Sequence, residues 1–245
     1  FKSVKTEGKG KSISEIGRAL LKVCMNGRLI LLIIIISGFW MIQSQMYATM
    51  PKYVIRLIGE GASPGWYANV NPFVVFLCVN FVTTIMKKYT AINSMMVGMF
   101  IIPFSALVMS FGNLFGGEPI LGMHPVAFMM IIGIAMQALA ECFISPRFLE
   151  YFSLQSPKGE EGLYLGFSHL HSFFSYLFAF GLSGFLLEKY CPDPKNFASA
   201  AEYAVATEHA HYIWYVFVGI GLISAIALII YSQVVKRIDA KKIQA

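Results

Sequence analysis

The chain has 245 residues and a formal net charge of +6, with 57% hydrophobic residues and only 13% charged ones. An ordinary soluble domain carries about twice that charged fraction. So few charged groups cannot cover a water-facing surface of this size, which excludes a soluble fold for most of the chain. The four cysteines show neither metal-binding spacing nor the pattern of a disulfide framework.

The first part of the chain, residues 1–27, is predicted to be a basic cytoplasmic linker. Residues 1–11 are polar and rich in Gly and Lys, which is typical of a flexible segment. Ser12 and Glu15 have the spacing of a capping box and open a short amphipathic helix. We expect this helix to lie on the inner membrane face, with a soluble linker helix as the alternative. Because the chain begins at Phe1 without a signal peptide, we interpret it as part of a longer protein.

Six apolar stretches follow, and each is long enough to cross a bilayer as a helix, because a hydrocarbon core of ~30 Å needs about 20 residues. The predicted spans are 29–50, 67–86, 91–112, 125–146, 163–187 and 212–235. The first is expected to kink at Pro51 and to continue to Ile58, with Gly59 as C-cap. The predicted fold is an all-α membrane protein with a six-helix transmembrane bundle over residues 28–245.

The distribution of cations predicts the orientation of the bundle. Fourteen of the 19 Lys and Arg residues fall before the first span, after the sixth, or in the connections after the second and fourth. Four fall in the other connections, namely Lys52, Arg56, Lys189 and Lys195. The positive-inside rule therefore places both ends in the cytoplasm, and the cell membrane is the expected location. The net charge reflects this topology and does not indicate nucleic-acid binding, since no basic groove with interleaved aromatics accompanies it.

Ionisable side chains at membrane depth are candidates for function, because each costs ~2.5 to 3.5 kcal/mol at the centre of a spanning helix. Glu141 is the strongest candidate, since it follows the uncharged segment 125–140, and Ser145 and the helix-bending Pro146 come one turn later. A carboxylate that faces a cavity could bind an ammonium group or take a proton. A structural hydrogen bond to a neighbouring helix is the alternative.

Other polar side chains fall within the same spans. Trp40, Gln43 and Tyr47 share one face of the first span, and Asn71 opens the second. Such groups often hold helices together, but with Glu141 they could also line one polar cavity.

Further along the chain, Arg147 and Glu150 are three residues apart and are expected to form an ion pair. His169 and His171, two positions apart on the fifth span, are expected to point to opposite sides of the helix and so cannot share a metal ion. We expect at least one of these histidines to pack inside the bundle, and the other could relay a proton.

The fifth span also contains Gly181-Leu182-Ser183-Gly184, the G-x-S-G pattern of rhomboid-type intramembrane serine proteases. That chemistry needs a histidine on another helix, whereas His169 and His171 share the serine's own helix, ~18 to 21 Å away. A serine protease is therefore only a distant alternative. Gly181 and Gly184, like Gly219 and Gly221 in the sixth span, are expected to be positions of close helix packing.

The pattern of six spans after a basic linker helix resembles the C-terminal half of a major facilitator superfamily transporter. It is similar, more specifically, to the proton-dependent oligopeptide transporter family. The similarity rests on Phe39-Trp40 followed by Gln45, on Asn71-Pro72, on Glu141-x-x-x-Ser145-Pro146 followed by Leu149, and on Gln155-Ser156-Pro157. It covers essentially the whole chain, as helices seven to twelve of twelve.

The resemblance implies roles for individual residues. Glu141 stands at the position of the family's carboxylate that meets the amino terminus of the peptide, and Asn71 at that of an asparagine that contacts the peptide backbone. Trp40 would line the same pocket. Gln43 is a departure, because the family commonly has a glutamate there for proton coupling, and an amide cannot carry the proton. A tryptophan typical of the eleventh helix is also absent, where His171, Phe173, Phe174 and Tyr176 stand instead.

The predicted function is therefore proton-coupled symport of di- or tripeptides by alternating access, with the proton as coupling ion and no other cofactor. The expected substrate-binding residues are Glu141, Asn71, Trp40, Gln43, Tyr47 and Ser145. Proton coupling or a gate is expected at Glu141, Arg147, Glu150, His169 and His171. The partners are the peptide, an N-terminal six-helix half and the bilayer. Transport of a nitrate-like anion, a metabolite or a drug is the main alternative, and a receptor-like role of the same fold is a further one.

Overall fold

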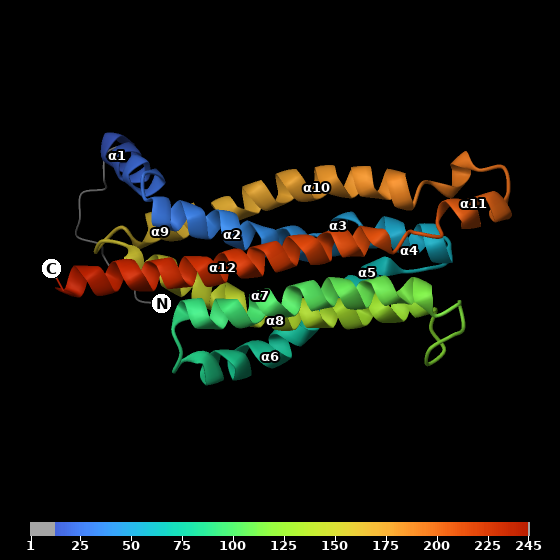
Figure 1. The fold of residues 1–245 in the computed structure, drawn as a ribbon, viewed down its shortest axis with the longest axis horizontal. Coiled ribbons are helices and arrows are strands. Elements are labelled where there is room, and N and C mark those ends of the chain that lie inside the picture. The colour runs from blue at the N-terminus through green and yellow to red at the C-terminus, as the bar shows by residue number, and fades with distance from the viewer. Residues whose placement is uncertain (1–12, 245) are drawn as a thin grey trace, which may run out of the picture.

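The computed structural model describes residues 13–244. Within that range the chain is helical, and apart from one bridge between Ile120 and Met123 it contains no β-structure. The long helices run side by side in an elongated bundle (Figure 1). Six of them are long and apolar enough to cross a membrane: Gly27–Ala48, Pro64–Met86, Ala91–Leu114, Pro125–Gln155, Glu161–Tyr190 and Tyr212–Lys241. The predicted all-α fold with six spans is confirmed.

Several spans consist of more than one helical segment. The helices are α1 (Ile13–Cys24), α2 (Gly27–Gln43), α3 (Gln45–Ala48), α4 (Met50–Ile58), α5 (Pro64–Ala68), α6 (Val70–Met86), α7 (Ala91–Ser110), α8 (Pro125–Gln155), α9 (Glu161–Ser168), α10 (Leu170–Tyr190), α11 (Ala200–Ala206) and α12 (Tyr212–Gln244), with short 3-10 turns η1 (Phe111–Leu114) and η2 (Pro194–Asn196). The predicted short helix before the first span is α1, on which Leu20 and Leu21 are exposed and Val23 is buried. Ser12 of the expected capping box lies outside the described residues.

The first span is interrupted twice before Pro51. α2 ends at Gln43 and α3 at Ala48, while Pro51 lies in the first turn of α4. Proline has no amide hydrogen to donate to the carbonyl four residues earlier, and its ring crowds that carbonyl, so the chain adjusts upstream of it. The expected end at Ile58 is confirmed, with Gly59 in a left-handed conformation at φ +111°.

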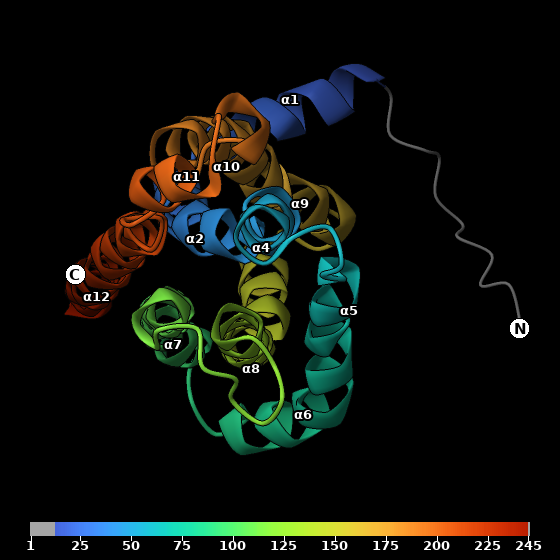
Figure 2. The ribbon, with the colours of Figure 1, turned by 90° about the vertical axis from the view of Figure 1, so that its right-hand side faces the viewer.

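The helices form two groups, which are seen in Figure 2 along the bundle. α2, α10 and α12 lie on one side and α6, α7 and α8 on the other, and α7 packs against both α8 and α12. The buried core contains large side chains from both groups, among them Phe39, Phe148, Phe152, Trp214 and Phe217. Large apolar side chains of α6 and α10 remain exposed, including Phe73, Phe76, Phe81, Phe173 and Phe178. Such faces suit contact with lipid or with another helical bundle.

Glycines allow close contact between α7 and α8. A Cβ atom added to Gly98 would lie 2.6 Å from the Ala140 carbonyl oxygen, well inside van der Waals contact. The expectation of close packing was wrong for Gly181, Gly184 and Gly219, where an added Cβ would meet nothing within 4 Å. Gly181 and Gly184 lie on the exposed face of α10, so no neighbouring helix approaches them. Of the predicted set only Gly221 is a contact position, because a Cβ atom added there would lie 3.0 Å from Pro103 Cβ.

Candidate functional site

A cavity of about 180 Å³ lies between α2, α3, α6, α8 and α10. Its lining residues are Trp40, Gln43, Ser44, Met46, Tyr47, Asn71, Glu141 and Tyr176. The cavity thus brings together five of the six residues expected to bind substrate, and Ser145 is the one that does not line it.

Glu141 is the centre of the polar contacts in this cavity. Its Oε2 atom accepts a hydrogen bond from Gln43 Nε2 at 2.9 Å and another from Asn71 Nδ2 at 3.2 Å. Within residues 13–244, Oε1 has no hydrogen-bond partner, and neither Lys nor Arg pairs with the carboxylate. Two neutral amides orient the carboxylate without neutralising it, so its negative charge stays available to a cation that enters the cavity.

Two further polar atoms of cavity residues are buried and lack a partner in the described part of the chain. They are Gln43 Oε1 and Trp40 Nε1. Leaving a buried polar atom unpaired costs about 1–3 kcal/mol, which a bound polar molecule can recover. Two residues that line the cavity therefore keep one unpaired acceptor and one unpaired donor, both closed off from solvent in this structure.

Local helix geometry positions these side chains. Trp40 and Gln43 lie about one turn apart on α2, so both face the same neighbours. Asn71 lies in the first turn of α6, directly after the interruption at Asn69. Glu141 lies within α8, which continues through Pro146 to Gln155. The interruptions in two spans and one unbroken helix together create the polar cavity.

His171 lies behind the cavity wall. Its ring centroid is 5.1 Å from that of Trp40 and 5.2 Å from that of Phe148. Nδ1 lies 2.6 Å from the Ser168 carbonyl oxygen, to which it donates, and Nε2 is 3.1 Å from the Ser172 hydroxyl. Buried and with both nitrogens partnered, His171 packs against the aromatic wall.

The expected separation of His169 from His171 is wrong. The two ring centroids are only 5.9 Å apart, although His169 is exposed and His171 buried. The prediction assumed one continuous helix, whereas α9 ends at Ser168 and α10 begins at Leu170. This interruption changes the direction of the two side chains.

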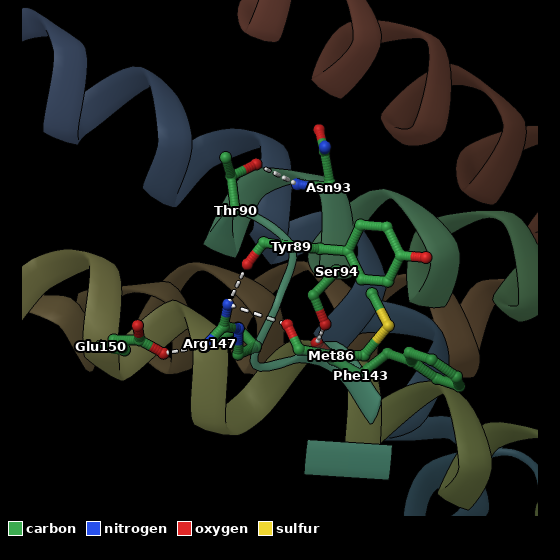
Figure 3. A network of polar contacts seen from close by, with 8 residues as sticks. All are labelled: Met86, Tyr89, Thr90, Asn93, Ser94, Phe143, Arg147 and Glu150. Atoms are coloured by element: carbon green, nitrogen blue, oxygen red, sulfur yellow. Dashed lines mark hydrogen bonds and ion pairs between the residues drawn. The ribbon is translucent and has the colours of Figure 1, made fainter. Parts of the chain in front are cut away.

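Arg147 belongs to a separate network, shown in Figure 3. Its guanidinium forms the expected ion pair with Glu150, and Nη2 donates to the carbonyl oxygens of Tyr89 and, at 3.2 Å, of Met86. Met86 ends α6 and Tyr89 lies in the turn to α7, so Arg147 fastens this turn to α8. Arg147 is six residues from Glu141 along α8, about 9 Å at 1.5 Å per residue, and does not line the cavity.

The comparison with protein families decides the identity of the fold. The sequence model of one protein family, described as POT family, matches residues 14–196 of the chain. This range includes every residue that lines the cavity. The chain belongs to the POT family. This is the family of proton-coupled peptide transporters that the sequence pattern predicted, and members are transmembrane proteins. No curated protein and no solved structure matches the chain.

Sequence reasoning missed several features of this POT-family cavity. Ser44 and Met46 line it only because the first span is interrupted, and the hydrogen bond from Gln43 to Glu141 joins residues 98 positions apart. Tyr176 was noticed as a departure in the fifth span but was not placed in the cavity.

The G-x-S-G pattern has a structural environment in this POT-family chain. Ser183 is buried, and its Oγ lies 2.7 Å from the Thr49 hydroxyl, which is also 2.5 Å from Gln45 Oε1. No histidine is among the hydrogen-bond partners of Ser183 in residues 13–244. The serine links α10 to the interrupted first span.

Proposed function

We propose that this chain is one half of a proton-coupled symporter for di- and tripeptides, and that the cavity around Glu141 binds the amino terminus of the peptide. Family membership supports the reaction class. One observation carries the site, namely that Glu141 is held by Gln43 and Asn71 and has no cationic partner in the described residues. A protonated amino group is the partner that such a carboxylate lacks.

The size of the cavity supports a second bundle. Ligand sites usually have volumes of about 300–1,000 Å³, and the cavity holds about 180 Å³. A di- or tripeptide would therefore need further walls, which another six-helix half can supply on the side of α6 and α10. Alternating access then arises as the two halves rock around the shared site. In this arrangement both ends of the chain face the cytoplasm, as the distribution of cations indicates, and the proposed location is the cell membrane.

Proton coupling is assigned to the same carboxylate. Gln43 cannot titrate, and among the described residues that line the cavity Glu141 is the only carboxylic acid. Protonation of Glu141 while the peptide is bound removes the charge that holds the ammonium group, so the proton and the peptide cross together and the peptide is then released. Arg147 and Glu150 hold the turn between α6 and α7 against α8, which favours a structural role for this ion pair over a role as a moving gate. His169, the exposed member of the histidine pair, is the one that could exchange protons with water.

The test uses the full-length transporter in proteoliposomes with a proton gradient. Glu141→Gln should abolish uphill uptake of a labelled dipeptide, because the amide can neither bind the ammonium group as strongly nor carry the proton. Glu118→Gln, which changes an exposed carboxylate in the loop before α8, is the matched control and should transport normally. Uphill uptake by the Glu141 variant at the wild-type rate would exclude the proposal.

A second measurement separates peptides from other cargo. Dipeptides should raise the melting temperature of the purified transporter, and the same peptides with an acetylated amino terminus should not. If no peptide stabilises the protein while nitrate or another small solute does, the alternative cargo is correct and the peptide assignment is wrong.

A further inference from the structure

A second, larger cavity lies on another side of the bundle, away from the site around Glu141. It has a volume of about 750 Å³ and is formed mainly by the beginning of α2 and the end of α12. Its walls include Leu31 and Ile35 from α2 and Ile230 and Val234 from α12. A smaller cavity of about 430 Å³, which includes Ile34 and Ile223, follows along the same two helices. Together we call them the α2–α12 groove.

The groove faces away from the peptide cavity. At 100° per residue, Leu31, Ile34 and Gly38 lie on the side of α2 opposite Trp40 and Gln43. A second bundle that completes the peptide site would therefore cover the other face of α2. Both walls of the groove belong to spanning helices, so the groove opens toward the bilayer.

The groove walls are apolar and accessible. Leu31 is 49% exposed and Ile230 is 57% exposed, which in a spanning helix means contact with hydrocarbon. From Gly27 to Ile35 the groove extends over eight residue-to-residue steps of α2, about 12 Å at 1.5 Å per step. Tyr231 closes part of its floor, where its hydroxyl lies 3.1 Å from that of Tyr151 and 3.2 Å from the Arg28 carbonyl oxygen. This shape suits an acyl chain.

One end of the groove is cationic. Arg28 lines it and forms a two-point ion pair with Asp239, at 2.6 and 3.2 Å, while its Nε atom is buried without a partner in the described residues. Arg237 and Lys241, both exposed, continue the helix face of Ile230 and Val234 beyond the apolar part. Three cations and one carboxylate thus lie at this end of the groove, and Arg237 and Lys241 lie on the side of α12 opposite Asp239. A phosphate group can accept hydrogen bonds from the exposed Arg237 and Lys241 and balance the remaining positive charge.

We propose that the α2–α12 groove is a binding site for one anionic phospholipid. The acyl chain lies along Leu31 and Ile230, and the phosphate lies beside Arg28, Arg237 and Lys241. The lipid comes from the leaflet in which α2 begins and α12 ends. It holds these two helices together without occupying the peptide cavity.

The first test is native mass spectrometry of the full-length protein with added phosphatidylglycerol or phosphatidylcholine. We expect phosphatidylglycerol to bind roughly tenfold more tightly, from the excess of positive charge. Arg237→Gln should weaken phosphatidylglycerol binding by roughly fivefold. Lys236→Gln is the control, because it removes the same charge from the opposite side of α12 and should have little effect. Equal binding of the two lipids, or equal effects of the two variants, would overturn the proposal.

The second test fills the groove. Ile230→Trp should displace phosphatidylglycerol, and Leu222→Trp, which adds the same bulk to an exposed position on α12 outside the groove lining, should not. The wild type is also labelled in native membranes with a phosphatidylglycerol that carries a photoreactive acyl chain, and adducts are expected at Leu31 and Ile230. Adducts mainly at Leu222, or crosslinks showing that α12 of a second copy or another polypeptide segment occupies the groove, would contradict the assignment.

Discussion

Gln43 on α2 donates a hydrogen bond to Glu141 on α8, with 2.9 Å between Nε2 and Oε2. The residue that departs from the family pattern is therefore in direct contact with the carboxylate that the pattern identifies. A neutral amide at position 43 orients Glu141, which is the single carboxylic acid among the described residues that line the cavity.

This contact predicts energetic coupling between the two residues. Gln43→Leu and Glu141→Leu should each change the free energy of unfolding, and the double variant should change it by less than the sum of the two. A hydrogen bond to a charged group contributes about 1.5–3 kcal/mol, so a coupling energy of that order is expected. Thermal unfolding of the four proteins in one detergent measures it. If the effects of the two substitutions are additive, the coupling energy is zero and the contact does not contribute to stability.

The Arg147 network predicts unequal roles for the two partners of the ion pair. Arg147→Met removes two hydrogen bonds to backbone carbonyls and should destabilise the protein by about 2–4 kcal/mol. Glu150→Gln should cost less than about 1 kcal/mol, because the Glu150 side chain is 42% exposed and water screens its charge. Unfolding midpoints of both variants decide the matter. Similar losses of stability in the two variants would mean that the ion pair with Glu150, not the hydrogen bonds to the backbone carbonyls, holds the turn between α6 and α7.

Close packing of α7 on α8 predicts that Gly98 cannot be enlarged. In Gly98→Ala the new Cβ would lie 2.6 Å from a backbone oxygen, so the helices must separate, at a cost of about 1–3 kcal/mol. Gly181→Ala is the control, since open space surrounds that glycine. It should leave stability unchanged or raise it slightly through its better helix propensity. A loss in Gly181→Ala as large as in Gly98→Ala would contradict this packing.

The connection between α10 and α12 contains a cysteine, Cys191, that we expect to be unreactive. Burial raises the pKa of the Cys191 thiol to about 12, so the group stays protonated and neutral throughout the physiological range. Arg56 lies across it, with Nη1 bonded to the Cys191 carbonyl oxygen at 2.6 Å and its own carbonyl accepting from the Tyr203 hydroxyl at 3.0 Å. The thiolate is the reactive form, so a maleimide should label exposed Cys24 readily and Cys191 only after denaturation.

Peptide mapping by mass spectrometry checks this prediction between pH 7 and 9. If Cys191 is labelled as fast as Cys24 in the folded protein, the connection between α10 and α12 must open and expose the thiol. The Cys191→Ser variant is the control for the assignment, because the maleimide adduct at position 191 should be absent from it.

The amino-acid sequence by itself determined the class of fold, the six spans and the family. Each segment that crosses the hydrocarbon core must by itself be long, apolar and helical. An uncharged run such as 125–140 therefore indicates a spanning helix without knowledge of its neighbours. The same reasoning identified Glu141, because a charge at membrane depth is costly wherever the helix packs. The sequence also indicated Asn71 and Trp40, through the family motifs that contain them.

Only the tertiary structure decided which side chains meet. The bond between Gln43 and Glu141, the close approach of His169 to His171 and the open space around Gly181 depend on helix interruptions and on the neighbouring helix. The hydrogen bond between Gln43 and Glu141 joins positions that are far apart in the chain. His169 and His171 lie across a helix interruption, and the directions of their side chains depend on how the two segments pack. Periodicity describes the faces of one straight helix, and the partner of each face is fixed only when all six spans pack together.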